Sequence, residues 1–341
     1  MQPEIEPAAG RPAQPEPFLR GCAYPAFEDV PYPRAALGPP GDRLPADTRA
    51  KASIPVGVRF ELRGDARAIA VDYEARGGEL GLRGEAAGCD FSLYRAGRLV
   101  ARQRAAPGRH RALLALGAGF DPDERAILYL PEGLLPRVRA LIGVEGEIAP
   151  APAQPRWLCY GDSIAEGWLA SEPALAWPAI AGREQGLDVA NLGYAGAARG
   201  ELVSAEQLAA LPADLISLSH GTNCWQRLPH SAARMREGLR DFLSVLREGH
   251  PATPVVCVSP LLRPQAEASP NRLGATHAAL RAVFEAVVRE RIAAGDAQLL
   301  LVEGAELVAP ELLPDGIHPG DAGHRALAAA LGPRLVSALG R

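Results

Sequence analysis

The hydrophobic pattern of the chain changes its period once, near residue 150. Between residues 18 and 148, apolar and polar positions alternate, which is the period of a half-buried strand. The clearest run sets Val56, Val58, Phe60 and Leu62 between glycine and charged residues. Turns rich in glycine or proline separate such runs, and none has a convincing helical period. Residues 18–148 are therefore predicted to form an antiparallel β-sandwich of the jelly-roll type.

Two proline-rich stretches flank this predicted sandwich. Residues 1–17 are rich in proline, glutamate and alanine and leave little to bury, so they are predicted to form a flexible tail. Residues 149–155 alternate proline with other residues, which favours an extended and stiff linker. The linker would join the sandwich to a second domain at 156–341.

Beyond the linker, strand-length apolar runs alternate with segments of helical period. Strands are predicted at 157–160, 188–192, 214–219, 254–259 and 298–302. Helices are predicted at 173–185, 201–211, 231–248, 271–294 and from residue 320 onward. This alternation is typical of a parallel sheet with helices on both faces, so the second domain is predicted to be α/β.

Composition narrows the classes of function. The 341 residues carry a net charge of -4 and no long basic run, which argues against a nucleic-acid partner. Lys51 is the sole lysine, so a Schiff-base or phosphate-loop lysine is excluded elsewhere. The five cysteines are scattered and no residues have metal-ligand spacing, so we expect reduced thiols and neither metal nor cofactor. The N-terminus does not resemble a signal peptide, and no apolar run reaches the roughly 20 residues of a membrane helix. A cytoplasmic protein that does not bind membranes is expected.

Chemically useful residues follow the ends of the predicted strands, where ligand sites of open α/β sheets gather. Ser163 follows the first strand within a Gly-Asp-Ser sequence. A serine hydroxyl needs a neutral imidazole to take its proton, and His318 can supply it. Asp315 lies three residues earlier in the same loop and can orient that imidazole. Ser163, Asp315 and His318 are therefore predicted to form a catalytic triad.

An oxyanion needs hydrogen-bond donors that are already in place. The segment Asn191–Gly196 follows the second strand, and Gly221-Thr222-Asn223 follows the third. We expect the backbone N–H groups of Ser163 and Gly196 and the side-chain amide of Asn223 to form an oxyanion hole.

These four blocks, in this order and spacing, resemble the SGNH (GDSL) hydrolase superfamily over about residues 156–341. The resemblance implies a flavodoxin-like three-layer α/β/α fold and supports the roles given above to Ser163, Gly196, Asn223, Asp315 and His318. Many members carry an acidic residue after the block-three asparagine, whereas this chain has Cys224 and Trp225. Both residues are predicted to line the substrate pocket. The predicted sandwich resembles accessory jelly rolls of some carbohydrate esterases and acyl-transferring relatives.

Other polar residues near these blocks have structural interpretations. Asp162 is expected to form the turn, and Gly193 to serve the geometry of its loop. His220, His277 and His324 are expected to be packed in the structure rather than catalytic. Cys224 is interpreted as a pocket-wall thiol and not as a nucleophile, while Trp225 is equally compatible with contact to the substrate and with a surface position.

The sequence thus predicts a serine esterase that cleaves a small acyl ester, such as an O-acetyl or short acyl group on a sugar or natural product. An alternative with the same catalytic residues is an acyltransferase that moves an acyl group from a thioester or ester donor to a hydroxyl. A third is a carbohydrate-binding module protein with secondary esterase activity. The oligomeric state is left open.

Overall fold

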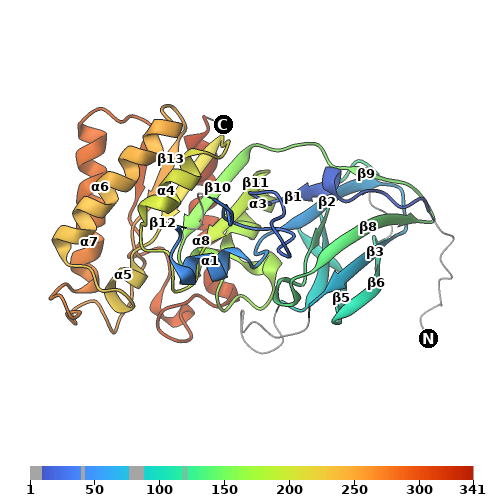
Figure 1. Cartoon of the computed structure of the whole chain (residues 1–341), viewed down its shortest axis with the longest axis horizontal. Helices are drawn as coiled ribbons and strands as arrows, with labels where there is room; N and C mark the ends of the chain where they lie inside the picture. Colours follow the sequence, from blue (N-terminus) through green and yellow to red (C-terminus); the bar gives the residue numbers. More distant parts are fainter. Residues whose placement is uncertain (1–9, 40–42, 77–87, 118, 120, 341) are drawn as a thin grey trace.

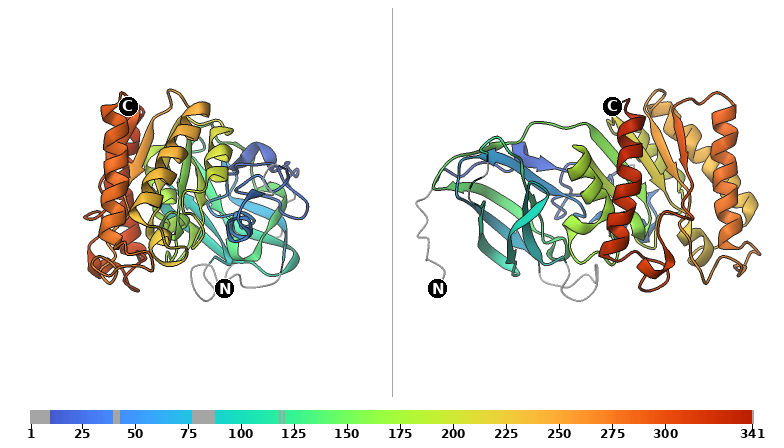
Figure 2. Two further views of the ribbon diagram at one scale, coloured as in Figure 1. Left: turned by 60° about the vertical axis from the view of Figure 1, so that its left-hand side comes forward. Right: turned by 180° about the vertical axis from the view of Figure 1, so that it is seen from behind.

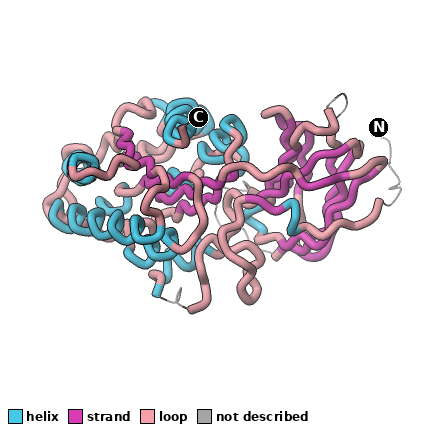
Figure 3. Tube along the Cα trace, turned by 90° about the horizontal axis from the view of Figure 1, so that it is seen from above, coloured by secondary structure: helices cyan, strands magenta, loops and turns pink. Residues whose placement is uncertain are grey.

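Two domains of different architecture lie side by side along the long axis of the molecule (Figure 1). The computed structural model describes residues 10–39, 43–76, 88–117, 119 and 121–340. Viewed from above, most of the helices gather in one half and the strands of the other domain in the opposite half (Figure 3). Among the described residues, no helix is both long and apolar enough to cross a membrane.

The C-terminal half contains a parallel sheet with the strand order β11-β10-β12-β13-β14. Its strands are β10 (Arg156–Gly161), β11 (Asp188–Gly193), β12 (Leu215–Ser219), β13 (Val255–Val258) and β14 (Leu299–Val302). This order is that of a flavodoxin-like fold, whose ligand site lies where the strand order reverses, here between β10 and β12. The predicted α/β/α class is confirmed.

Helices cover both faces of this sheet, because each strand is apolar on both sides. Along β10, Leu158 and Tyr160 join one core cluster, while Trp157 and Cys159 join the other. The first cluster is covered by α4 (Leu202–Ala209), α6 (Ala232–Gly249) and α7 (His277–Ala293), and the second by α3 (Trp177–Gln185) and α8 (Asp321–Ala338). Figure 2 shows α8, in red, lying across the rear face.

The N-terminal half contains two antiparallel sheets, as the alternating pattern predicted. One has the order β1-β2-β7-β4-β5 with β9 paired to β2, and the other has the order β6-β3-β8. The strands are β1 (Leu19–Arg20), β2 (Arg59–Gly64), β3 (Ala68–Ala75), β4 (Asp90–Arg95), β5 (Arg98–Arg104), β6 (Gly108–Ala115), β7 (Ala126–Tyr129), β8 (Arg137–Val144) and β9 (Ile148–Pro150). Their shared core includes Phe60, Ile69, Val71 and Phe91.

Much of the connection between β1 and β2, over its described residues 21–39 and 43–58, packs on the α/β domain, although Tyr32 and Val58 belong to the core of the sandwich. It contains α1 (Ala46–Ala52), which the period-two pattern did not predict. Ala35, Leu37 and Leu44 are buried in the same cluster as Leu158 and Tyr160. Part of the range 18–148, which was predicted for the sandwich, thus contributes to the core of the α/β domain. The limits of the sandwich stay a prediction.

Three further differences between the prediction and the structure concern the start of one long helix, two short helices and the linker. The helix predicted from residue 271 begins at His277, since Leu273, which fits the helical spacing, is 55% exposed in a turn before it. The single-turn helices α2 (Ser163–Glu166) and α5 (Thr222–Gln226) are too short to have a period. Part of the predicted linker forms β9, in which Ala149 and Pro150 pair with β2.

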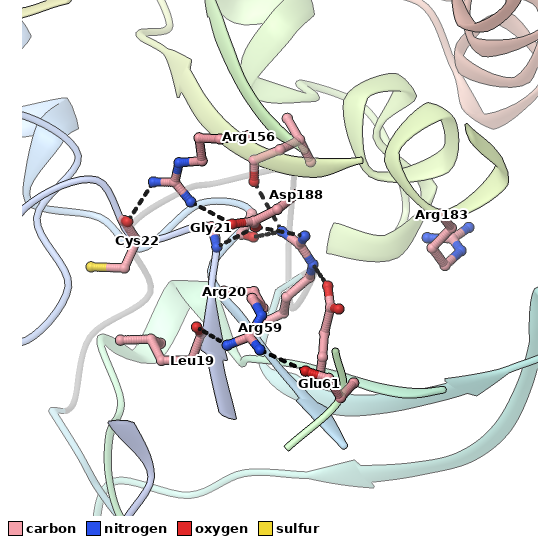
Figure 4. A network of polar contacts seen from close by, with 12 residues as sticks. Leu19, Arg20, Gly21, Cys22, Arg59, Glu61, Arg156, Arg183 and Asp188 are labelled. Carbon is pink, nitrogen blue, oxygen red and sulfur yellow. Dashed lines mark hydrogen bonds and ion pairs between the residues drawn. The ribbon is translucent and has the colours of Figure 1, made fainter. Parts of the chain in front are cut away.

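A buried polar network joins the two domains (Figure 4). Asp188, at the start of β11, accepts hydrogen bonds from Arg59 Nη2 of β2 (3.0 Å), Arg156 Nη1 (2.7 Å) and the backbone N–H of Gly21 (3.0 Å). Arg59 also donates through Nε to Glu61 Oε1 (2.7 Å) and is 3% exposed. Although burial raises the pKa of Asp188, the charges of Arg59 and Arg156 hold it below its usual value. The two domains are thus joined by buried ion pairs, in which the arginines keep the carboxylate of Asp188 ionised.

We expect Arg59→Met to reduce the free energy of unfolding by about 3 kcal/mol or more, because the buried carboxylates of Asp188 and Glu61 each lose one of their two arginine partners. The matched change Arg63→Met breaks an exposed ion pair with Asp123 and should cost under about 1 kcal/mol. Urea unfolding of both variants measures the difference. Equal losses in the two variants would contradict a structural role for the interdomain network.

Candidate active site

Ser163 is delivered by a strand that ends in a sharp turn. β10 ends at Gly161, and Asp162 caps α2 by accepting the Ile164 N–H at 3.0 Å. A methyl group on Gly161 would lie 2.5 Å from the carbonyl oxygen of Ser219, so the strand can turn here only with glycine. The structure therefore assigns Asp162 the turn-forming position that was expected, and it sets Ser163 at the first position of α2.

A continuous chain of hydrogen bonds links three predicted residues. Ser163 Oγ lies 2.8 Å from His318 Nε2, and His318 Nδ1 lies 2.7 Å from Asp315 Oδ2. The other Asp315 oxygen accepts the backbone N–H groups of Ile317 (3.0 Å) and His318 (2.7 Å). With Nδ1–H directed to the carboxylate, the lone pair of Nε2 faces the serine hydroxyl.

The carboxylate of Asp315, the last group in this series of hydrogen bonds, is held in its charged form. Partial burial raises the pKa of Asp315, but hydrogen bonds from the ring and backbone of His318 outweigh it and keep the pKa below its usual value. An ionised Asp315 can hold the imidazole in one tautomer and stabilise the imidazolium that forms when it takes a proton.

The residues expected to bind an oxyanion lie on the loops after β11 and β12. Asn223, in α5, is 7% exposed and donates one amide hydrogen through Nδ2 to the Ala198 oxygen at 3.0 Å. Its second amide hydrogen remains for a ligand. Gly196 has a φ of +71°, a conformation that favours glycine. The Asn223 bond joins the two loops at the point where the strand order reverses.

The end of β11, from which the Gly196 loop starts, also packs closely against α2. Asn191 donates through Nδ2 to the Ala165 oxygen (2.8 Å) and accepts the Gly193 N–H (2.9 Å). A methyl group on Gly193 would lie 2.3 Å from the Glu166 nitrogen. The glycine therefore serves the geometry of the loop, as expected, by allowing two backbones to approach.

Sequence reasoning missed Arg34, whose guanidinium is buried beneath this loop. Nη1 donates to the backbone oxygens of Gly193 and of Asn191 (3.3 Å), and Nη2 donates to Glu166 Oε1 at 2.7 Å. The other Glu166 oxygen accepts the Ala195 N–H at 3.1 Å. Arg34 is 1% exposed. A residue from the β1–β2 connection therefore fixes the segment that leads to Gly196.

The same arginine is fixed from its own side. Its Nε donates to the Ile54 oxygen and its Nη2 to the Lys51 oxygen, each at 2.7 Å. A second tie runs through Arg199, whose Nη1 donates to the Gly196 oxygen (3.1 Å) and to Asp47 Oδ2 of α1 (2.9 Å). The sequence gives little sign of the contacts of Arg34 and Arg199, because most of their acceptors are backbone carbonyls.

The structure corrects the predicted pocket role of Cys224. Its side chain is fully buried among the core residues of the α/β domain, and Sγ lies 3.7 Å from the Arg199 oxygen. Burial raises the pKa of this thiol. Trp225 is half-buried; its Nε1 donates to the Ser269 oxygen at 2.9 Å, and the Arg263 guanidinium stacks on its ring. The α5 helix turns the cysteine inward and leaves the tryptophan near the surface.

The three other histidines that were singled out are enclosed by protein, as expected. His220 is 2% exposed and packs among Tyr160, Phe242 and Phe284. His277 caps no helix end but contacts Glu267 at 3.2 Å, and His324 contacts the Trp168 oxygen at 3.1 Å. In the described part of the chain, no cluster of three or more histidine, cysteine or acidic side chains is arranged to hold a metal ion.

Comparison with known proteins gives a consistent result. Residues 159–326 match the GDSL-like Lipase/Acylhydrolase family. A solved structure of a salicylyl-acyltransferase, SsfX3, from a tetracycline biosynthetic pathway is similar over 98% of both chains, with a TM-score of 0.81 and 28% identity. No curated protein sequence matches this chain.

Two less similar structures share the fold over nearly the whole chain. One is a putative GDSL-like lipase from Bacteroides ovatus, with a TM-score of 0.78, 22% identity, and 97% of this chain and 98% of the other covered. The other is an acetyl xylan esterase, Est2A, from Butyrivibrio proteoclasticus, with a TM-score of 0.63, 15% identity, and 98% and 99% covered. The two-domain arrangement is therefore common to several proteins.

We expect Arg34→Met to loosen the loop that leads to Gly196. Removal of the guanidinium leaves Glu166 buried without this partner and frees two loop carbonyls, at a cost of about 3 kcal/mol or more. Hydrogen exchange of residues 193–198 should accelerate more than that of β14. Uniform acceleration throughout the α/β domain would mean that Arg34 has no local effect on the loop.

The N-cap should make stability depend on pH. Burial raises the pKa of Asp162 to about 6, against about 3.9 in an unfolded chain. The native state then holds this proton more tightly, so the contribution of Asp162 to the free energy of unfolding falls as pH rises from about 4 to about 6. Asp162→Asn keeps an N-cap acceptor and should remove this component, which urea unfolding across that range measures. Parallel profiles for the two proteins would contradict the expectation.

Proposed function

Since the chain belongs to the GDSL-like lipase/acylhydrolase family, we propose that it is a serine enzyme that acts on acyl esters through an acyl-enzyme on Ser163. The observation that carries the proposal is the hydrogen-bonded chain from Ser163 Oγ through His318 to Asp315. Nucleophile, base and orienting carboxylate stand within contact of one another, which is the geometry that acyl transfer requires.

The reaction proceeds in two balanced steps. His318 Nε2 takes the Ser163 proton while Oγ attacks the ester carbonyl, and the resulting imidazolium protonates the leaving alcohol. Water then attacks the acyl-enzyme while His318 removes its proton, and the imidazolium returns that proton to Ser163 Oγ as the carboxylic acid leaves. Asp315 stays ionised throughout and stabilises the imidazolium.

The developing oxyanion is held by three donors in this proposal. These are the backbone N–H groups of Ser163 and Gly196 and the free amide hydrogen of Asn223. Loss of one such donor typically lowers turnover by about 10²–10³. The ties of Arg34 and Arg199 to the Gly196 loop keep these donors in position before the substrate binds.

Hydrolysis of a small acyl ester is the first candidate. Ser163 is 5% exposed, but the Asp315 side chain is 42% exposed and the His318 side chain 15% exposed, so water can approach the acyl-enzyme from the side of the base. A closed site would keep water away from the acyl-enzyme, whereas an open site allows water to attack it. The proposed substrates are O-acetyl or short acyl esters of a sugar or natural product.

Acyl transfer to a hydroxyl is the second candidate, and one specific observation favours it. The salicylyl-acyltransferase is similar over both domains and retains 28% identity across 98% of each chain. An acceptor alcohol would replace water in the second step, with His318 taking its proton in the same way. All catalytic residues would be shared between the two activities.

We expect the protein to hydrolyse 4-nitrophenyl esters and to prefer short acyl chains. Ser163→Ala should lower kcat by at least about 10³-fold, because it removes the hydroxyl that contacts His318 Nε2. Ser244→Ala, an exposed position on α6, should leave the rate unchanged. Turnover that survives in Ser163→Ala would sink the proposal.

The partition between water and alcohol separates the two candidates. With an acyl thioester as donor, an acceptor should divert acyl groups from acid to ester, because both routes share one acyl-enzyme. Chromatography of the products measures the ratio. Acid formation that no candidate alcohol lowers would argue against transfer.

A further inference from the structure

Three cationic side chains surround the triad without a carboxylate partner. They are Lys51, Arg227 and Arg263, and we call them the cationic rim. None has an ion pair among the residues that the structure describes. Free cations are ordinary on an open surface, so the argument depends on where these three lie.

Arg227 lies directly over the predicted oxyanion loop. A methyl group on Gly196 would be 3.1 Å from its Nε, 3.2 Å from its Cζ and 3.4 Å from its Nη2. The residue is exposed at the end of α5, one turn after Asn223, to which its backbone N–H is bonded at 3.2 Å. Its charge therefore adjoins the region where a bound acyl group would meet Gly196.

Arg263 lies on the other side of α5. Its guanidinium stacks on Trp225 at 4.7 Å and donates through Nη2 to Gln226 Oε1 at 2.7 Å. The residue is only 7% exposed, although buried arginines are normally paired with an anion. The nearby carboxylate of Glu267 is bound by Arg281. Asp315 is close enough to act on the charge of Arg263.

Lys51 approaches the triad from the β1–β2 connection. Its Nζ lies 5.5 Å from the centre of the Trp168 ring, and that ring lies 6.0 Å from the ring of His318. A cation over an aromatic face is stabilised by the ring and keeps its charge available. The three cations of the rim thus come from three separate segments of the chain.

Two acidic side chains of this region are paired with arginines, Asp47 with Arg199 and Glu166 with Arg34. Asp315 binds the imidazole of His318, and Asp162 caps α2 beside Ser163. The three rim cations therefore remain available to an anionic ligand, although the whole chain has a net charge of -4. Guanidinium groups suit carboxylates and phosphates, which they bind through paired hydrogen bonds.

We propose that the cationic rim selects a substrate with an anionic group, a carboxylate or a phosphate, beside the scissile bond. The inference rests on the proposed acyl-enzyme and specifies its substrate class. The anion would supply Arg263 with the partner it lacks and would attract the substrate to the triad, an effect of about tenfold or more on association at low salt. The charge could belong to the acyl group or to the leaving group.

Two pairs of substrates distinguish these sources. A charge on the acyl group is tested by mono-4-nitrophenyl glutarate against 4-nitrophenyl valerate, which have acyl chains of equal length. A charge on the leaving group is tested by acetyl-coenzyme A against S-acetyl-N-acetylcysteamine, which lacks the phosphates. In at least one pair, kcat/KM should favour the anionic member about tenfold or more at low salt. Salt at about 0.5 M should reduce the preference.

Variants tie this preference to the rim. Arg227→Gln and Arg263→Gln should each lower the ratio of anionic to neutral kcat/KM severalfold, and the double variant should bring it near one. Arg263→Lys keeps the charge and should retain most of the ratio, which guards against a folding defect at that buried position. The control Arg334→Gln, near the far end of α8, makes the same charge change and should leave the ratio intact. Equal kcat/KM values in both pairs, or equal ratios in the double variant and the control, would overturn the inference.

The proposed function and this inference can fail separately. Ester turnover that depends on Ser163 but shows no charge preference removes the inference alone. Turnover that persists in Ser163→Ala removes the proposed function. The charge preference is then still judged by the kcat/KM ratio within each substrate pair, which Arg227→Gln should lower severalfold.

Discussion

A buried guanidinium connects the geometry of the site to the rest of the chain. Arg34 holds backbone oxygens of the Gly193 loop and one oxygen of Glu166, whose other oxygen binds the Ala195 N–H. A fully buried charge is costly unless every donor has a partner, so these contacts form together or not at all. The loop that carries Gly196 is thereby fixed relative to the turn that carries Ser163.

This dependence changes how the two domains are understood. The β1–β2 connection belongs to the sandwich by sequence but completes the core and the predicted oxyanion loop of the α/β domain. Removal of residues 1–150 would therefore take away Arg34 and Asp47 together with the sandwich. A loss of activity in such a truncation would reflect the site itself, and it would carry no information about carbohydrate binding.

The sequence was most informative where burial follows a regular period. The run Trp157–Tyr160 is apolar on both faces because helices cover both sides of β10, and this made the α/β class and the position of Ser163 predictable. Asp315 and His318 were instead predicted from their side-chain chemistry and their spacing within one loop. The pattern failed where apolar residues are exposed, as at Leu273, and where a contact ends on backbone atoms, as for Arg34. It also could not tell that Cys224 faces the core, because one turn of helix has no period.

In the contacts of Arg34, a substitution can remove the donor far more easily than the acceptors. Its oxygen acceptors at positions 191 and 193 belong to the main chain, and every amino acid supplies an identical carbonyl there. A substitution cannot remove these two acceptors, although the close approach of Gly193 to Glu166 restricts position 193 to glycine. The donor has no such redundancy, since guanidinium alone offers five N–H groups in a rigid plane. The single arginine beneath this segment is therefore the position where the arrangement is most easily lost.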